Sequence, residues 1–146
     1  VQCRPVSLPQ LGRELEETAR LLAPALNLSC SFPQEGQAEL DHGLFLTVAE
    51  NLIANAARFA CSRMELSLKT DNGFLVLTAA DDGPGFPQEL IQNGPKPFGK
   101  RDGDAAHFGM GLYSSQLLCR KHGGDLRLNN CPGATVTASF KFQGKT

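Results

Sequence analysis

Three short polar patterns along the chain combine residue types that bind charged ligands. The first is Asn51, Asn55 and Arg58, whose i, i+4, i+7 spacing places the three side chains in one stripe along a helix. The stripe lies beside the apolar face of that helix rather than opposite it. Half-buried asparagine is costly without partners. The pattern therefore fits either a polar ligand or cation, or amides that bond a neighbouring strand or loop.

The second pattern is Asp81-Asp82-Gly83-Pro84-Gly85, at the end of an apolar strand. An aspartate at the mouth of a buried strand can accept a hydrogen bond from an exocyclic amine of a ligand, and the glycines allow close approach to the backbone. An ordinary turn between two elements is the alternative, and this short pattern taken alone favours it.

The third pattern is HFGMGL at 107–112, where a loop rich in glycine and proline enters a helix. Glycines at a helix start expose N–H groups that bind anions or phosphate, and Lys96, Lys100 and Arg101 add positive charge. A flexible connection with solvated charges is the alternative. The pattern is neither a P-loop nor a dinucleotide-binding loop, because Ser114 stands at the third glycine position and no strand precedes.

Hydrophobic periodicity places these patterns in an α+β fold. It predicts helices and strands in the order helix 8–24, strands 27–32 and 37–40, helix 42–61, hairpin strands 63–69 and 74–80, short helix 87–92, helix 111–122, and strands 125–129 and 134–142. Residues 93–109 are expected to form one long loop. This order predicts a two-layer α/β sandwich and not a doubly wound parallel sheet. The strand at 74–80 is apolar almost throughout, so we expect it to be central and covered on both faces.

Composition excludes several classes of protein. The chain has 146 residues, a formal charge of -1, 41% apolar and 20% charged residues, which indicates one globular domain and not a disordered tail, coiled coil or nucleic-acid binder. It contains no apolar run long enough to cross a membrane and no signal peptide. The five cysteines lie at least 12 residues apart and the three histidines are scattered. We therefore expect reduced, mostly buried cysteines in a cytoplasmic chain, and no transition-metal site.

The patterns together resemble a known family in their order and spacing. The matching segments are NLIANAARF (51–59), DDGPGF (81–86), PFGK (97–100), GMGL (109–112) and CRKHGGDL (119–126). In this order they resemble the catalytic ATP-binding domain of bacterial sensor histidine kinases, within the GHKL ATPase superfamily. The resemblance covers essentially the whole chain as a single domain, 1–146. It implies a Bergerat-type sandwich, with a mixed, mostly antiparallel sheet of about five strands covered by three helices.

The resemblance also implies roles for individual residues toward ATP and Mg²⁺. Asn55 is expected to coordinate Mg²⁺, Asn51 to lie beside the phosphates and Arg58 to contact phosphate, which makes these three the catalytic set. Phe59 is expected to pack on adenine and Asp81 to accept its amino group. The remaining nucleotide-binding residues that it implies are Gly83 and Gly85 in the pocket floor, Phe98 and Lys100 in a lid at 93–109, and Gly109, Met110, Gly111 and Leu112, a segment with N–H groups directed at the phosphates.

Two positions depart from related patterns. His107 stands where the family often has another glycine, so the lid is stiffer or the imidazole contacts phosphate, unless His107 is simply an exposed loop residue. Gyrase-type ATPases carry a water-activating glutamate one helical turn before the Mg²⁺ asparagine, and this chain has Asn51 there. Glu50 points about 100° away around the helix. We therefore expect slow hydrolysis of ATP by water.

The implied function is transfer of the ATP γ-phosphoryl group to a histidine on a separate dimerisation helix, in two-component signalling. That helix is expected to precede Val1, so the fragment alone is not expected to autophosphorylate. The implied partners are the dimerisation helices and a cognate response regulator, without nucleic acid or membrane insertion by this fragment. The implied parent is a bacterial inner-membrane sensor kinase. The alternatives are an anti-sigma-type serine kinase of the same superfamily and a non-catalytic nucleotide-binding regulatory domain.

Overall fold

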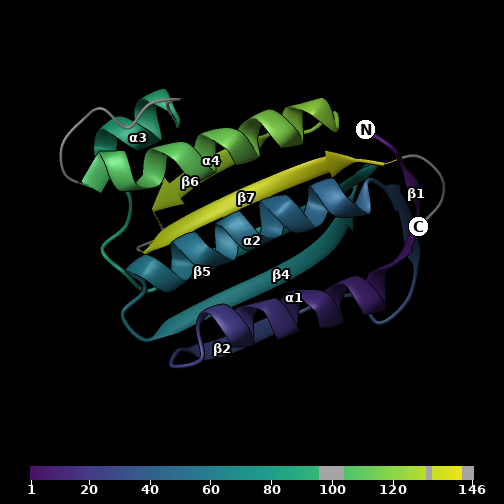
Figure 1. The fold of residues 1–146 in the computed structure, drawn as a ribbon, viewed down its shortest axis with the longest axis horizontal. Helices are drawn as coiled ribbons and strands as arrows, with labels where there is room; N and C mark the ends of the chain where they lie inside the picture. Colours follow the sequence, from purple (N-terminus) through teal and green to yellow (C-terminus); the bar gives the residue numbers. More distant parts are fainter. Residues whose placement is uncertain (96–103, 131–132, 143–146) are drawn as a thin grey trace.

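The chain folds into a layer of helices on one face of a five-stranded sheet, as a computed structural model shows (Figure 1). The structure describes residues 1–95, 104–130 and 133–142, and gives only the backbone of residues 104–110. The helices are α1 (Leu8–Leu22), α2 (His42–Phe59), α3 (Gln88–Asn93) and α4 (Asp104–Lys121). The strands are β1 (Arg4–Ser7), β2 (Asn27–Ser31), β3 (Gln37–Leu40), β4 (Arg63–Asp71), β5 (Phe74–Asp81), β6 (Leu126–Asn130) and β7 (Ala134–Lys141).

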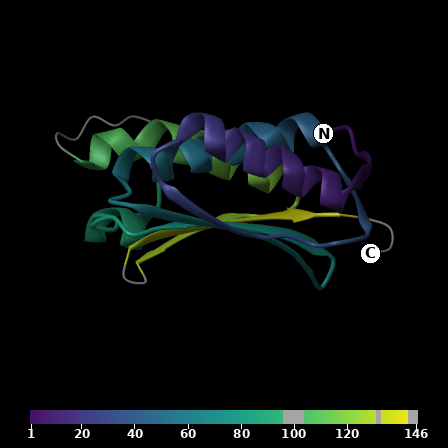
Figure 2. The ribbon, with the colours of Figure 1, turned by 90° about the horizontal axis from the view of Figure 1, so that it is seen from below.

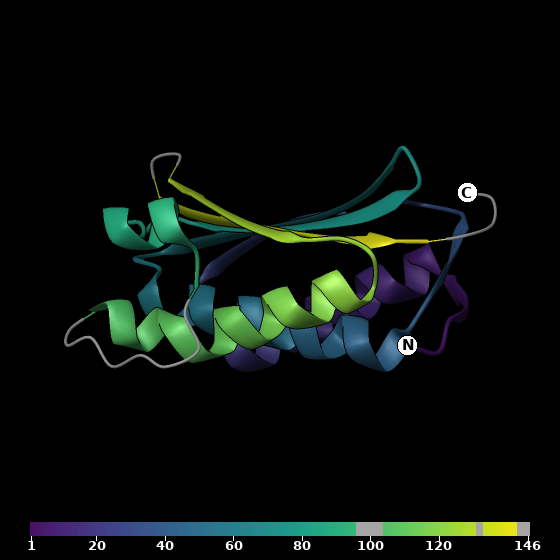
Figure 3. The ribbon, with the colours of Figure 1, turned by 90° about the horizontal axis from the view of Figure 1, so that it is seen from above.

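The main sheet has the order β2-β4-β5-β7-β6, with β5 at its centre. Strand β2 pairs parallel to β4, and the other three pairings are antiparallel. Helices α1, α2 and α4 cover one face (Figure 2), and α3 lies beside one end of the sheet (Figure 3). The expected α+β class, with a mixed and mostly antiparallel sheet of about five strands under three helices, is confirmed.

Local capping chemistry determines where the first two large helices begin. Ser7 precedes α1 and its hydroxyl accepts the Gln10 N–H at 3.3 Å. Asp41 precedes α2 and its Oδ1 accepts the Leu44 N–H at 3.1 Å. Both bonds satisfy N–H groups that a helix leaves free in its first turn. Apolar spacing then decides which side of each helix faces the sheet.

The hairpin between β4 and β5 forms where the sequence predicts it. Asn72 and Gly73 occupy its turn with φ values of 51° and 84°. Both lie in the left-handed region that asparagine and glycine tolerate best. The register pairs Asp71 with Phe74 and Met64 with Asp81. The carboxyl end of β5 therefore lies beside the start of β4.

The core lies between the covered face of the sheet and the helices. Helix α2 buries the apolar residues predicted for its inner face, and Phe45 packs on Phe140 of β7 with ring centroids 5.0 Å apart. Phe140 is fully buried, and the centroid of its ring lies 5.7 Å from that of the His122 ring in a T-shaped arrangement. The imidazole Nε2 of His122 accepts the Asp41 N–H at 2.9 Å, so the end of α4 is tied to the start of α2.

Several boundaries differ from the sequence prediction. Strand β1 was not expected, and it pairs antiparallel with β3 in a separate two-stranded sheet. Helix α4 begins at Asp104 and not at 111. Its first residues, Asp104-Ala105-Ala106, combine an acidic side chain that favours a helix start with two strong helix formers. The expected loop 93–109 is therefore interrupted, and its central part at 96–103 lies outside the described residues.

Burial also differs from expectation in two places. Strand β5 is central, but only alternate residues are buried, because helices cover one face of the sheet alone (Figure 2). The prediction that both faces are covered is wrong. Among the described cysteines, Cys119 is buried, whereas Cys3, Cys30 and Cys61 are exposed, so mostly buried cysteines were also a wrong expectation. In the part of the chain that the structure describes, no helix is long and apolar enough to cross a membrane.

Truncation of Phe140 should test how much the sheet–helix interface contributes to stability. We expect Phe140→Ala to lower the free energy of unfolding by about 3–5 kcal/mol, because a fully buried aromatic ring leaves a cavity. Leu21→Ala is the control, since Leu21 is 82% exposed at the end of α1. That control should change stability by no more than about 0.5 kcal/mol. Chemical denaturation measures both, and equal effects would contradict this position for the core.

Candidate functional site

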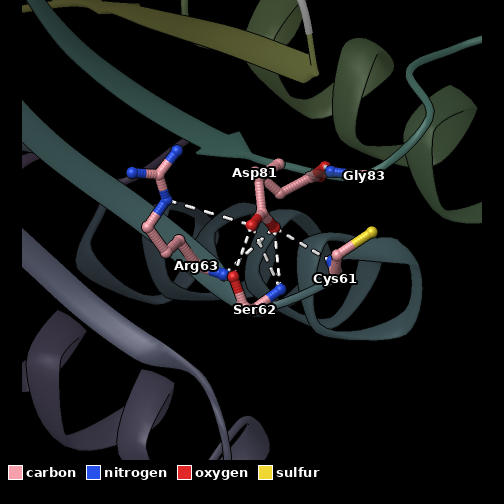
Figure 4. Close-up of polar contacts among 6 residues, drawn as sticks. Cys61, Ser62, Arg63, Asp81 and Gly83 are labelled. Carbon is pink, nitrogen blue, oxygen red and sulfur yellow. Dashed lines mark hydrogen bonds and ion pairs between the residues drawn. The ribbon is translucent and has the colours of Figure 1, made fainter.

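Asp81 ends the central strand with a half-buried carboxyl group. Its Oδ1 accepts the Gly83 N–H at 2.8 Å, and the Ala134 N–H also donates to the carboxylate. Burial raises the pKa of Asp81 above its ordinary value, and these two bonds offset the rise only in part. Figure 4 shows the side chain turned toward Gly83. The carboxylate keeps lone pairs beyond those that the backbone uses, so it can accept a further hydrogen bond from a ligand.

Gly83 brings the end of β5 against the end of α2. A Cβ at position 83 would lie 2.2 Å from the carbonyl oxygen of Phe59 and 3.0 Å from Oδ1 of Asp81. No side chain fits there, because the first contact is with rigid backbone. Phe59 is half-buried and packs against the core, and the Arg58 guanidinium lies 5.7 Å from its ring centroid. Three residues of the predicted site, Phe59, Asp81 and Gly83, therefore meet in the structure.

Gly85 has a different neighbour. Its φ is +89°, and a Cβ there would lie 2.7 Å from Oδ1 of Asn130 on β6. Asn130 accepts the Phe86 N–H at 2.7 Å through this oxygen and donates through Nδ2 to the Phe86 carbonyl at 3.0 Å. Gly85 thus lets an edge strand hold the segment that leaves Asp81. Sequence reasoning missed Asn130, since an asparagine at a strand end carries no signal of its own.

The two asparagines of α2 have different surroundings. Asn51 donates from Nδ2 to the hydroxyl of Ser115 at 3.0 Å, and Ser115 is fully buried on α4. This bond joins the two helices, whereas the structural alternative considered for the stripe was a bond to a neighbouring strand or loop. Asn55 is half-buried one turn further along, and its amide has no hydrogen-bond partner among the residues that the structure describes. Asn55 is thus free to bind a ligand.

The glycine segment of the third pattern lies inside α4 and not at its first turn. Gly109, Met110, Gly111 and Leu112 all fall within the helix Asp104–Lys121. Their N–H groups lie beyond the free first turn, so the expected helix-start geometry at 109–112 is wrong for this conformation. Leu112 is buried in the core, and a Cβ on Gly111 would contact nothing within 4 Å.

The remaining predicted residues cannot be placed. Phe98 and Lys100 lie outside the described residues, as do Lys96 and Arg101. His107 falls in α4, where only the backbone is described.

A hollow of about 170 Å³ lies beside Asp81, but Glu65 and Ala80 place it toward the uncovered face of the sheet. It therefore lies on the face of the sheet opposite α2, the helix that carries Asn51 and Asn55.

Comparison with known families matches this arrangement. Residues 41–144 match the family described as histidine kinase-, DNA gyrase B-, and HSP90-like ATPase. The chain belongs to this family. Its relatives include sensor histidine kinases and sensor proteins. It is 31% identical to sensor histidine kinase CssS of Bacillus subtilis over 56% of this chain, and 33% identical to sensor protein CseC of Streptomyces avermitilis over 86% of it.

The fold agrees with solved catalytic domains. The catalytic domain of histidine kinase ThkA superposes with a TM-score of 0.80 at 19% identity, covering 99% of this chain and 100% of that one. Mycobacterial sensor histidine kinase MprB gives a TM-score of 0.78 at 22% identity, covering 98% and 99%. By contrast, the chain spans only 18% of CssS and 25% of CseC.

Removal of the Ser115 hydroxyl should test the link between α2 and α4. We expect Ser115→Ala to lower the free energy of unfolding by about 1 kcal/mol, the net value of one hydrogen bond. Ser114→Ala is the matched control, because Ser114 is its exposed neighbour on the same helix. A double-mutant cycle with Asn51→Ala should give a coupling energy of similar size. Additive effects would mean that the two side chains do not interact.

Proposed function

We propose that this chain binds ATP with Mg²⁺ and transfers the γ-phosphoryl group to a histidine on a helix outside the residues present here. The observation that carries the proposal is the half-buried carboxylate of Asp81, held against the end of α2 by the close approach of Gly83 to Phe59. Family membership supports a nucleotide site at this junction over an ordinary turn. The curated relatives are sensor kinases, which favours a histidine acceptor over a serine.

Asp81 would select adenine through its remaining acceptor capacity. The carboxylate is half-buried, so a bond from the adenine amino group forms with limited competition from water. Phe59, whose carbonyl lies at the same junction, carries an aromatic ring of the kind that can pack against a base. Arg58 adds a positive charge 5.7 Å from the centroid of this ring, which would attract an anionic ligand.

Helix α2 offers one protein ligand for a magnesium ion whose other ligands would be phosphate oxygens and water. Asn55 offers an amide oxygen without a competing protein bond, and the described residues contain no cluster of three His, Cys, Asp or Glu side chains able to hold a metal. One protein ligand suits Mg²⁺, which keeps several waters and binds substrate phosphates. When bound, Mg²⁺ neutralises charge that develops on the β- and γ-phosphate oxygens.

In the transfer step this chain would act mainly by positioning the ATP phosphates, and it would form no covalent intermediate. A ring nitrogen of the acceptor histidine attacks the γ-phosphorus as the bond to the β–γ bridging oxygen breaks, and ADP leaves. Asn51 occupies the position one turn before Asn55 where a carboxylate could activate water, and its amide is bonded to Ser115. Glu50 is exposed on another side of the helix. This arrangement favours transfer to an incoming histidine over hydrolysis.

Replacement of the Asp81 carboxylate should weaken ATP binding. Asp81→Asn keeps the shape but exchanges an acceptor oxygen for an NH₂ group. We expect a loss of about 1.5–3 kcal/mol in binding free energy, the range for a hydrogen bond to a charged group. Calorimetric titration with a non-hydrolysable ATP analogue measures it. Asp71→Asn, an exposed carboxylate at the other end of the hairpin, is the control and should bind as the wild type does. Unchanged affinity in Asp81→Asn would place the adenine elsewhere.

Phosphotransfer should require a histidine acceptor on a separate helical region. With Mg²⁺ and γ-labelled ATP, the 146-residue chain alone should gain no acid-labile phosphohistidine label. Addition of the histidine-bearing helical region of its parent protein should give label on that partner. Asn55→Ala is the matched variant and should reduce labelling strongly while ATP binding without Mg²⁺ persists, because only the metal contact is lost. Stoichiometric phosphohistidine on the chain alone would contradict the proposal.

A further inference from the structure

Asp82 collects hydrogen bonds from the turn that follows α2. Its Oδ1 accepts three consecutive backbone N–H groups, those of Cys61 at 2.9 Å, Ser62 at 2.9 Å and Arg63 at 3.0 Å. Its Oδ2 accepts the Ser62 hydroxyl at 2.6 Å, and the Arg63 Nε lies 3.9 Å away. Figure 4 labels Cys61, Ser62 and Arg63, the three residues from which these bonds come. A single side chain therefore holds the whole turn.

The turn connects two parts of the proposed nucleotide site. Helix α2 ends at Phe59, and β4 begins at Arg63, so the bonded residues are the connection between them. Asp82 itself follows Asp81 at the end of β5. The β4–β5 ladder ends at the pair Met64 and Asp81. The Asp82 bonds continue this attachment beyond the last ladder pair as far as Cys61, two residues after the end of α2.

Neighbouring aspartates thus face different groups. The Asp81 carboxylate lies by Gly83, and that of Asp82 lies under the turn. The hydrogen bond from the Ser62 hydroxyl, followed by those from the backbone, holds the pKa of Asp82 well below its ordinary range, so the carboxylate is charged at neutral pH. The three donor residues are exposed. Water can therefore replace Asp82 as their partner, and loss of the carboxylate should loosen the turn without unfolding the domain.

We propose that Asp82 is a positioning residue of the nucleotide site, which sets the placement of Phe59 relative to Asp81 and thereby the strength of the bond from Asp81 to the adenine amino group. This inference rests on the proposed function. Asp82 contacts the turn and not the base, so its effect is indirect. Electrostatics alone would act in the opposite sense, because removal of a negative charge should strengthen binding of a polyphosphate. The direction of the change therefore separates positioning from charge.

The experiment compares ATP with purine riboside triphosphate, which lacks the 6-amino group. The dissociation constant of purine riboside triphosphate divided by that of ATP measures how much the bond to the amino group contributes. We expect Asp82→Ala to weaken ATP binding about tenfold, the scale of weakening one hydrogen bond to a charged group, while purine riboside triphosphate binding changes much less. Asp82→Asn should have a smaller effect, because its amide oxygen can still accept the three backbone N–H groups that Oδ1 accepts, and mainly the Oδ2 contacts change. Ser62→Ala, which removes one of the bonds, should have a smaller effect, and Asp71→Asn should have none.

Each outcome decides a separate question. A lower folded fraction would weaken both nucleotides equally, so an unchanged ratio in Asp82→Ala and Asp82→Asn would overturn the inference even if both affinities fell. Tighter ATP binding in these variants would also overturn it, in favour of a charge effect. A wild-type domain that binds neither nucleotide would overturn the proposed function itself. A reduced ratio with unchanged circular dichroism supports the positioning role.

Discussion

The end of strand β5 can lie against the last turn of helix α2 because residue 83 has no side chain. A Cβ there would meet the Phe59 carbonyl oxygen at 2.2 Å, well inside contact distance. This approach brings a residue from the sheet layer, Asp81, next to a residue from the helical layer, Phe59. A two-layer fold offers few places where both layers contribute polar groups to one point. The candidate site lies at one of them.

The pKa values of the two adjacent aspartates at this junction shift in opposite directions. Burial raises the pKa of Asp81, whereas hydrogen bonds from the turn at 61–63 lower that of Asp82. The difference arises because alternate residues at a strand end point to opposite sides. Asp81 points to the helical side and keeps acceptor capacity for a ligand. Asp82 is satisfied by the protein itself.

The helical layer adds a second connection. The bond from Asn51 to Ser115 links α2 to α4, and His122 links the other end of α4 to the start of α2. Helix α4 is thus attached to α2 at two places. Its first residues, 104–109, fall within the range 93–109 that the family resemblance assigns to a lid.

Local chemistry in the sequence was sufficient to predict the order of elements after β1, the Asn72-Gly73 turn, the inner face of α2 and the α+β class. Caps, turns and periodicity act over a few residues, so they can be read directly. The helix-start geometry at 109–112 failed, because Asp104 and the alanines after it begin the helix earlier. The one-sided cover of β5 also escaped prediction, since an apolar strand does not reveal how many layers pack on it.

Only the tertiary structure decided which polar groups meet. Asn51 and Ser115 are 64 residues apart, Phe86 and Asn130 are 44 apart, and Cys61 and Asp82 are 21 apart. The pairing of β1 with β3 likewise joins segments separated by α1 and β2. No local pattern encodes such partners, because the same asparagine, serine or aspartate can bond any donor or acceptor within reach. The sequence by itself determined which residues could bind a ligand, and the fold decided which of them the protein uses to hold itself together.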